Sequence, residues 1–292
     1  GVAAVNTLNV ETVKYIFEAA ETERVPVIVQ FYPGFENYTA LKHIAFAACD
    51  MAEKATVPVA VHLDHSATFE IAVSGIRDGF PSVMVDGSSL PFEENVALTK
   101  AVVRTANVFG VDVEAELGHV GIGASEDDIT NTDHYTRVDQ AVDFVERTGC
   151  GSLAIAVGNA HGPYVKVPNL DFDRIKAIRA KVDVPLVLHG CSDIPEEQLK
   201  EAVNLGMSKF NIATEYFRAM YRAMEADIKS QKFDGDGVGL MFDIREAMID
   251  FVVKKIRLLN PNKFSISLSA VGSLIKLDHG VFLSINQTLF QN

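Results

Sequence analysis

The sequence predicts an α/β fold in which eight parallel strands close into a (β/α)₈ TIM barrel. Short apolar runs alternate with helical stretches eight times before residue 231, and a barrel of this class takes about 250 residues. Several of the runs end in ionisable or amide side chains, which is typical of the carboxyl ends of barrel strands. The competing open, doubly wound sheet is disfavoured because no Gly-x-Gly-x-x-Gly follows the first strand.

The strands are predicted from their β-branched apolar runs, the pattern of strands buried on both faces. The clearest is Val59–Leu63, after which Asp64 stands between two histidines. We expect strands at residues 2–5, 25–30, 59–63, 82–86, 111–116, 153–157, 184–188 and 209–213.

Each strand is followed by a stretch with helical start signals. Asn9 can cap the first helix, and Pro195 suits the first turn of a later one. The Asp234–Gly237 turn lacks the later acidic ligand of a calcium loop, so we expect a solvated turn there. We expect helices at residues 10–22, 38–54, 68–78, 91–109, 137–148, 171–181, 195–205, 215–230 and 242–258. No internal boundary is evident, so one barrel with its C-terminal helix should span residues 1–263, with an irregular tail over 264–292.

Composition excludes several classes of protein. The chain has 292 residues, is 48% hydrophobic and carries a formal net charge of −13, whereas a nucleic-acid-binding protein needs a basic face. Its three cysteines suggest neither a disulfide framework nor a Cys-x-x-Cys zinc site, which favours a cytoplasmic protein. No clean apolar run of about 18 residues is present, so we expect no membrane span.

Three histidines stand at predicted strand ends and should meet on one face of the barrel. They are His65, His161 and His189. Three imidazoles suit a divalent metal that keeps an open coordination position for catalysis. A single such histidine is more often structural, and the metal interpretation depends on all three. We expect His62 to support a ligand or pack in the core, and we expect the remaining four to be surface or packing residues: His43, His119, His134 and His279.

A phosphate site is predicted where the seventh and eighth strands end. The two loops are Gly190-Cys191-Ser192 and Asn211-Ile212-Ala213-Thr214, and barrels often bind phosphate at this place through amides and hydroxyls. A metal beside a phosphate site suits carbon–carbon chemistry next to a carbonyl, because the ion can polarise the carbonyl. The alternative is a Schiff-base lysine. We expect Lys209 to stand at the wrong face of the barrel for that role.

Six stretches in order carry a family resemblance. The chain resembles class II, metal-dependent ketose-bisphosphate aldolases, the fructose- and tagatose-bisphosphate aldolase family, from Val2 to Leu259. The matching stretches are His62-Leu63-Asp64-His65, Val83-Met84-Val85-Asp86-Gly87-Ser88, Glu114-Ala115-Glu116-Leu117-Gly118, Gly158-Asn159-Ala160-His161-Gly162, Val187-Leu188-His189-Gly190 and Asn211-Ile212-Ala213-Thr214.

The resemblance implies roles for individual residues. His65, His161 and His189 would bind one catalytic Zn²⁺, and Asp86 with Glu116 would match a second divalent or monovalent cation position. Asp64 would exchange the proton of the C4 hydroxyl, and Glu126 would move the proton at the carbon next to the carbonyl. The substrate-binding residues would be Asn6, Gly162, Gly190, Cys191, Ser192, Asn211, Ile212, Ala213 and Thr214. Cys191 stands where the family more often has Gly or Ala, so we expect its side chain beside the phosphate amides.

The sequence therefore predicts reversible cleavage of fructose or tagatose 1,6-bisphosphate to dihydroxyacetone phosphate and glyceraldehyde 3-phosphate. The expected partner is a phosphorylated sugar, and the family default is a homodimer. Two alternatives stay open: a related aldolase that acts on a phosphorylated keto-deoxy sugar acid, and a non-catalytic barrel subunit of an aldolase complex.

Overall fold

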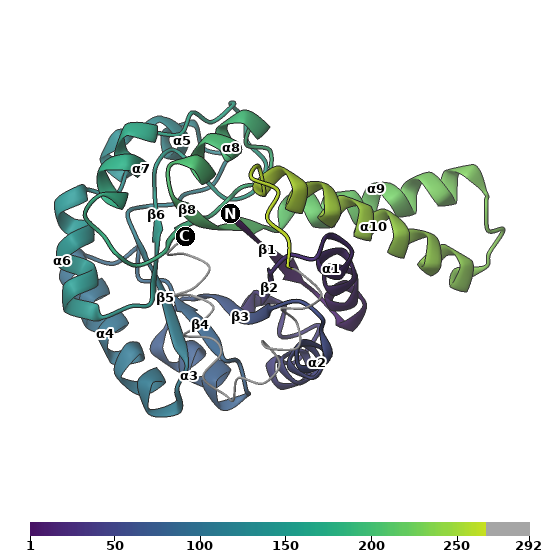
Figure 1. The fold of residues 1–292 in the computed structure, drawn as a ribbon, viewed down its shortest axis with the longest axis horizontal. Coiled ribbons are helices and arrows are strands. Elements are labelled where there is room, and N and C mark those ends of the chain that lie inside the picture. The colour runs from purple at the N-terminus through teal and green to yellow at the C-terminus, as the bar shows by residue number, and fades with distance from the viewer. Residues whose placement is uncertain (267–292) are drawn as a thin grey trace.

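The predicted barrel is confirmed by the computed structural model, which describes residues 1–266 (Figure 1). Eight parallel strands pair in chain order, and β1 closes the barrel against β8. The strands are β1 Val2–Thr7, β2 Val27–Phe31, β3 Val59–Ser66, β4 Ser82–Val85, β5 Asp112–Leu117, β6 Ser152–Ile155, β7 Leu186–Leu188 and β8 Met207–Ile212.

The helices form an outer ring around the strands (Figure 1). Outward-facing strand residues pack against this ring: Leu63 of β3 lies so close to Gly75 of α3 that a Cβ on Gly75 would clash with it. Burying such a leucine stabilises the fold by about 1.5–3 kcal/mol. The helices are α1 Val10–Glu23, η1 Pro33–Phe35, α2 Leu41–Lys54, α3 Phe69–Arg77, α4 Phe92–Phe109, α5 Glu126–Thr130, η2 Thr132–His134, α6 Val138–Thr148, α7 Phe172–Arg179, α8 Glu196–Asn204, α9 Thr214–Ser230 and α10 Gly237–Leu259.

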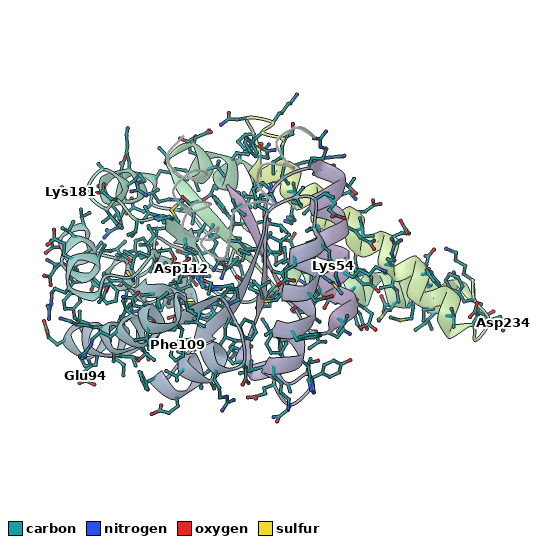
Figure 2. The ribbon with its side chains drawn as sticks, turned by 60° about the horizontal axis from the view of Figure 1, so that its bottom comes forward. Lys54, Glu94, Phe109, Asp112, Lys181 and Asp234 are labelled. Atoms are coloured by element: carbon teal, nitrogen blue, oxygen red, sulfur yellow. The ribbon has the colours of Figure 1, made fainter. Side chains whose placement is uncertain are left out.

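The last two helices form an arm that leaves the barrel. α9 and α10 run antiparallel away from the ring, and Asp234 marks the outer end of this arm (Figures 1 and 2). The second half of α10 returns to the barrel, where Met248 and Val252 are fully buried. Within residues 1–266, no helix is long and apolar enough to cross a membrane.

Several element boundaries differ from the sequence prediction. Helix α2 begins at Leu41 rather than at Tyr38. Helix α10 begins at Gly237 rather than at Phe242, because the side chain of Asp236 accepts hydrogen bonds from the first backbone amides and caps the helix. The loop after β5 contains the short helices α5 and η2, which the sequence did not predict. The predicted irregular tail lies mostly outside the described residues, from 267 to 292.

Candidate active site

An irregularity in β3 brings two consecutive side chains into one pocket. In a regular strand, successive side chains point to opposite faces. Here the register between β3 and β4 shifts between Leu63 and Ser66, and His65 has a positive φ of 42°. As a result Asp64 and His65 both line the pocket at the mouth of the barrel. A backbone conformation of this kind costs about 1–3 kcal/mol and is found mostly at functional sites.

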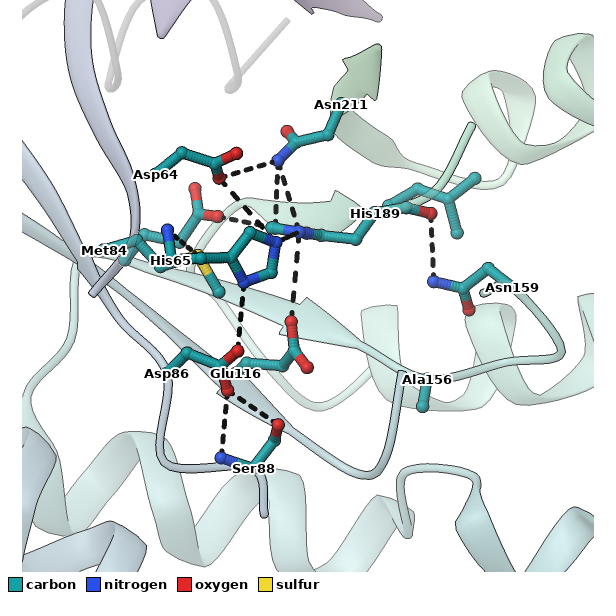
Figure 3. A network of polar contacts seen from close by, with 12 residues as sticks. Asp64, His65, Met84, Asp86, Ser88, Glu116, Ala156, Asn159, His189 and Asn211 are labelled. Carbon is teal, nitrogen blue, oxygen red and sulfur yellow. Dashed lines mark hydrogen bonds and ion pairs between the residues drawn. The ribbon is translucent and has the colours of Figure 1, made fainter. Parts of the chain in front are cut away.

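The three predicted histidines converge at this mouth, and Figure 3 shows two of them, His65 and His189. The Nδ1 atom of His189 lies 2.8 Å from the Nε2 atom of His65, and the ring centroids of His65 and His161 are 4.7 Å apart. Glu116 joins them, so that four donor atoms lie within 4.8 Å of one another. These four residues come from different strand ends or the loops that follow them. The strand ends therefore meet on one face of the barrel, as the sequence predicted.

Carboxylates hold the outer nitrogens of two of these rings. Asp86 Oδ2 lies 3.0 Å from His65 Nδ1, and its other oxygen accepts hydrogen bonds from the Ser88 amide at 3.1 Å and hydroxyl at 2.6 Å (Figure 3). Glu114 Oε1 lies 2.9 Å from His189 Nε2. Carboxylates in this position orient histidine ligands and fix their tautomers, so the inner nitrogens of His65 and His189 face each other.

The residues of this cluster fit a divalent cation. Glu116 Oε2 is buried and has no hydrogen-bond partner among the described residues, and burial together with nearby Asp86 raises the pKa of Glu116 well above its usual value. Burial lowers the pKa of His65, but Asp64, Asp86 and Glu116 outweigh it and bring this pKa to about 10. The same negative surroundings favour a bound cation. Imidazoles with one carboxylate are a donor set that zinc accepts.

Asp64 is held as a carboxylate by three amide side chains. Asn6 Nδ2 donates to it at 3.0 Å, Asn211 Nδ2 at 3.2 Å and Gln30 Nε2 at 3.3 Å. Burial disfavours the charged form, but His65, His189 and the Asn6 hydrogen bond outweigh burial, so the pKa of Asp64 lies below its usual value. Asp64 is therefore ionised at neutral pH and can accept a proton.

The structure agrees with the expectation that Lys209 is not placed for a Schiff base. Its side chain points into the barrel interior and is almost fully buried, with Nζ 2.7 Å from Glu114 Oε2. Because Lys209 and Asn211 are two residues apart on β8, they face the same side of the strand. Lys209 does not line the pocket, so the structure adds no support for a Schiff base. His62 also packs in the interior, with Nδ1 2.7 Å from Ser82 Oγ.

The pocket has a volume of about 440 Å³, which is the size that small-molecule sites usually have. Tyr32, Phe35 and Val120 form its apolar wall. Seven of the nine predicted substrate-binding residues line it: Asn6, Gly162, Gly190, Ser192, Asn211, Ala213 and Thr214.

Two predicted substrate contacts are not borne out. Cys191 is almost fully buried, its Sγ donates to the carbonyl of Leu188, and its side chain belongs to the hydrophobic core. Ile212 likewise packs in the core. Ile212 lies next to inward-facing Asn211 on β8, so strand alternation sends its side chain outward. Only the backbone of these two residues can contribute to the phosphate corner.

Comparison with known proteins identifies the family. The family model described as class-II fructose-bisphosphate aldolase matches residues 1–263. The chain belongs to this family. It is therefore a class II aldolase, a lyase of a family that is metal-dependent and acts on phosphorylated sugars.

Two further comparisons agree with this membership. The uncharacterized protein YdjI of Escherichia coli K12 is 41% identical over 257 residues, which cover 88% of this chain and 91% of YdjI. The crystal structure of the YdjI aldolase superposes with a TM-score of 0.79 at 39% identity, covering 89% and 91% of the two chains. A putative fructose-1,6-biphosphate aldolase from Coccidioides immitis has a TM-score of 0.76 at 29% identity, with the same coverage.

Two residues with supporting roles in this aldolase were missed at the sequence level. Asn159 donates to the carbonyl of His189 at 3.1 Å and so holds the backbone of that histidine. Tyr164 accepts from the Ala160 amide and donates to the Gly190 carbonyl, which joins two loops of the pocket. A Cβ on Gly190 would lie 2.0 Å from the Ala160 carbonyl oxygen, so only glycine fits this approach. Asn159 already lies in a family motif, but neither contact can be recognised without coordinates.

The structure does not bring Glu126 into the pocket of the aldolase. Glu126 is the first residue of α5, its side chain is 66% exposed, and its carboxylate pairs with Lys166 Nζ at 2.9 Å. Asp86 and Glu116 lie on different sides of the histidine cluster. Asp86 contacts the outer nitrogen of His65, whereas Glu116 faces the three histidines. A proton-transfer role for Glu126 and a second cation position at Asp86 and Glu116 stay predictions.

Proposed function

We propose that this aldolase reversibly cleaves a ketose 1,6-bisphosphate, with fructose and tagatose 1,6-bisphosphate as the first candidates. The products would be dihydroxyacetone phosphate and glyceraldehyde 3-phosphate. The observation that carries the proposal is the position of Asp64, an ionised carboxylate only 3.9 Å from His65 Nε2 beside the three-histidine cluster. A base at this distance can serve the C4 hydroxyl, two carbons from a C2 ketone that the cluster holds.

His65, His161 and His189 would bind one catalytic Zn²⁺. When bound, such an ion supplies Lewis-acid polarisation of the ketone. The surrounding side chains keep the ligands in place, with Asp86 behind His65 and Glu114 behind His189. The site is thus preorganised before substrate enters, and little reorganisation is needed on binding.

Asp64 would accept the proton of the C4 hydroxyl as the C3–C4 bond breaks, and would return it in the condensation direction. A positioned base acts within hydrogen-bond range, about 3 Å. Asn6, Gln30 and Asn211 hold both carboxylate oxygens by hydrogen bonds. These bonds fix the direction in which Asp64 can exchange a proton.

The phosphate of the dihydroxyacetone half would lie in the corner formed by Gly162, Gly190 and Ser192 and by the start of α9. Helix α9 begins at Thr214, and its first amides and dipole favour an anion. Ser192 Oγ already accepts from the Glu215 amide at 3.1 Å, which ties the two loops of the corner together.

Glu126 would deliver the second proton, at the carbon next to the carbonyl. One rigid carboxylate can hardly serve two separate atoms, and Asp64 is fixed in the barrel mouth. Glu126 lies on the loop between β5 and α6, whose Val120 lines the pocket. Closure of this loop would release Glu126 from Lys166 and bring it over the substrate.

A cleavage panel tests the substrate proposal. Zinc-loaded protein is incubated with fructose 1,6-bisphosphate, tagatose 1,6-bisphosphate and phosphorylated keto-deoxy sugar acids, and dihydroxyacetone phosphate or pyruvate is measured. The proposal expects dihydroxyacetone phosphate from a ketose bisphosphate. Pyruvate from a keto-deoxy acid would establish the alternative enzyme, and no turnover of any aldol substrate would favour a non-catalytic subunit.

We also propose a cytoplasmic homodimer in carbohydrate metabolism such as glycolysis. Family membership supports the dimer, and the three unpaired cysteines among the described residues fit a reducing compartment. Sedimentation equilibrium of the purified chain tests the dimer, and a monomer mass would contradict it.

A further inference from the structure

The loop between β5 and α6 carries a second cluster of side chains of metal-ligating types, separate from the active site. His119 stands at its start, Asp128 in α5 and His134 near its end, and their donor atoms lie within 4.8 Å of one another. None of the three lines the catalytic pocket. From the sequence, both histidines are expected to be ordinary surface or packing residues.

The spacing of the donor atoms suits an ion between them better than direct hydrogen bonds. His119 Nε2 lies 3.5 Å and His134 Nδ1 lies 3.9 Å from the same oxygen, Asp128 Oδ1. Good hydrogen bonds between nitrogen and oxygen span about 2.7–3.2 Å. The donors of a tetrahedral zinc ion, with bonds of about 2.0–2.2 Å, lie about 3.4 Å apart. A small inward shift of His134 would complete that geometry.

The three donors are held by contacts that leave their metal-facing atoms available. Asp128 uses its other oxygen, Oδ2, to accept the Ile122 amide at 2.8 Å. The His119 amide donates to the His134 carbonyl at 2.8 Å, which fixes the spacing of the two histidines. The Nδ1 atom of His134 is buried and has no hydrogen-bond partner within residues 1–266. A buried ring nitrogen without a partner is costly, and an ion would satisfy it.

We propose that His119, Asp128 and His134 form a second divalent-cation site. Two imidazoles and one carboxylate suit Zn²⁺ and the neighbouring transition metals rather than Mg²⁺ or Ca²⁺, which prefer oxygen ligands. Asp127 Oδ2, 3.8 Å from His134 Nε2, adds negative charge beside the site. His119 is 45% exposed, so an ion can enter from solvent.

An ion at this site would fasten the loop at three points. It would join the first residues of the loop, helix α5 and η2, and so restrain Glu126, which lies two residues before Asp128. The restraint would reach the active site through the backbone. The Gly121 carbonyl accepts from the His161 amide at 2.8 Å, and the Gly123 amide donates to the His161 carbonyl at 2.6 Å. The site would therefore stabilise the segment that pairs with a catalytic ligand.

Zinc titration of the full chain tests the site without a measurement of turnover. Protein loaded with one equivalent of Zn²⁺ is titrated with more Zn²⁺ in a calorimeter, and should bind a second ion. His119→Ala and Asp128→Asn should weaken this second binding about 10-fold or more, because even residues behind a ligand change metal affinity about 10–100-fold. His43→Ala and Asp133→Asn are the matched controls, and should bind as the wild type does.

Hydrogen exchange of the wild-type chain gives a second readout that needs no variant. Peptides covering residues 119–134 should exchange more slowly after the second equivalent, and those of the exposed arm should not change. Wild-type protein that binds no second ion would overturn the proposal. So would a second ion that survives both loop substitutions, or one that leaves exchange in residues 119–134 unaltered.

Discussion

The buried ion pair beneath the active site makes a quantitative prediction. Lys209 Nζ lies 2.7 Å from Glu114 Oε2, and the two side chains are 6% and 2% exposed. In Lys209→Met the apolar stem is retained and the charge is lost, so Glu114 keeps a buried carboxylate without its cation. Removing one partner of such a pair costs about 3–5 kcal/mol. His62 Nε2 lies 3.9 Å from Glu114 Oε2 and His189 Nε2 lies 2.9 Å from Glu114 Oε1, and both partly compensate for the lost cation. We therefore expect Lys209→Met to lower the free energy of unfolding by about 3 kcal/mol.

Removal of both charges should restore most of the stability. In Lys209→Met with Glu114→Gln no unpaired charge stays buried, and the glutamine can still hydrogen-bond to His189. Replacing a whole buried pair by neutral groups is often nearly neutral. We therefore expect the double variant within about 1 kcal/mol of the wild type, with a coupling between the two sites of about 2 kcal/mol or more.

Urea unfolding of the four proteins measures both values. The comparison is made at pH 7 in the presence of a chelator, since a metal bound to the native state would add its own stabilisation. A loss below about 1 kcal/mol in Lys209→Met would show that Lys209 does not neutralise Glu114 in the barrel. Strictly additive losses would refute the coupling.

Three further predictions concern the site. A chelator should abolish aldol cleavage and Zn²⁺ should restore it; His161→Ala should lose the pocket metal and turnover, whereas equal metal content in His161→Ala and His43→Ala would contradict the ligand assignment. Glu126→Gln should lose deuterium exchange at dihydroxyacetone phosphate by about 10²- to 10⁴-fold, while Asp64→Ala should lose cleavage but keep much of this exchange. NMR in deuterated water measures both, and wild-type exchange in Glu126→Gln would place the base elsewhere. Cys191 should resist iodoacetamide in the native protein, because the thiol is buried and burial raises its pKa; labelling before unfolding would show that its surroundings open.

Strand and helix periodicity was sufficient to predict the barrel. The alternation of β-branched runs with helical stretches depends on local patterns only, and parallel strands can close in few ways. The positions of His65, His161 and His189 at strand ends were also visible, because the carboxyl ends of parallel strands share one face. The convergence of these three histidines therefore followed from chain order.

Side-chain direction at single positions was decided by the tertiary structure. A shift of one residue in a strand sends a side chain to the other face, and the irregularity that places both Asp64 and His65 in the pocket has no signature in the sequence. The same uncertainty of one residue led to the wrong prediction for Cys191, which faces the core.

The sequence also did not predict which side chains of the loop between β5 and α6 lie close together. His119, Asp128 and His134 are separated by nine and six positions in a stretch without helical or strand period. Their approach depends on the turn at Gly118, on α5 and on the backbone bond between His119 and His134. Loops take their conformation from many weak contacts with the barrel rather than from local propensity. The tertiary structure, and not the local sequence, therefore brings these donors together.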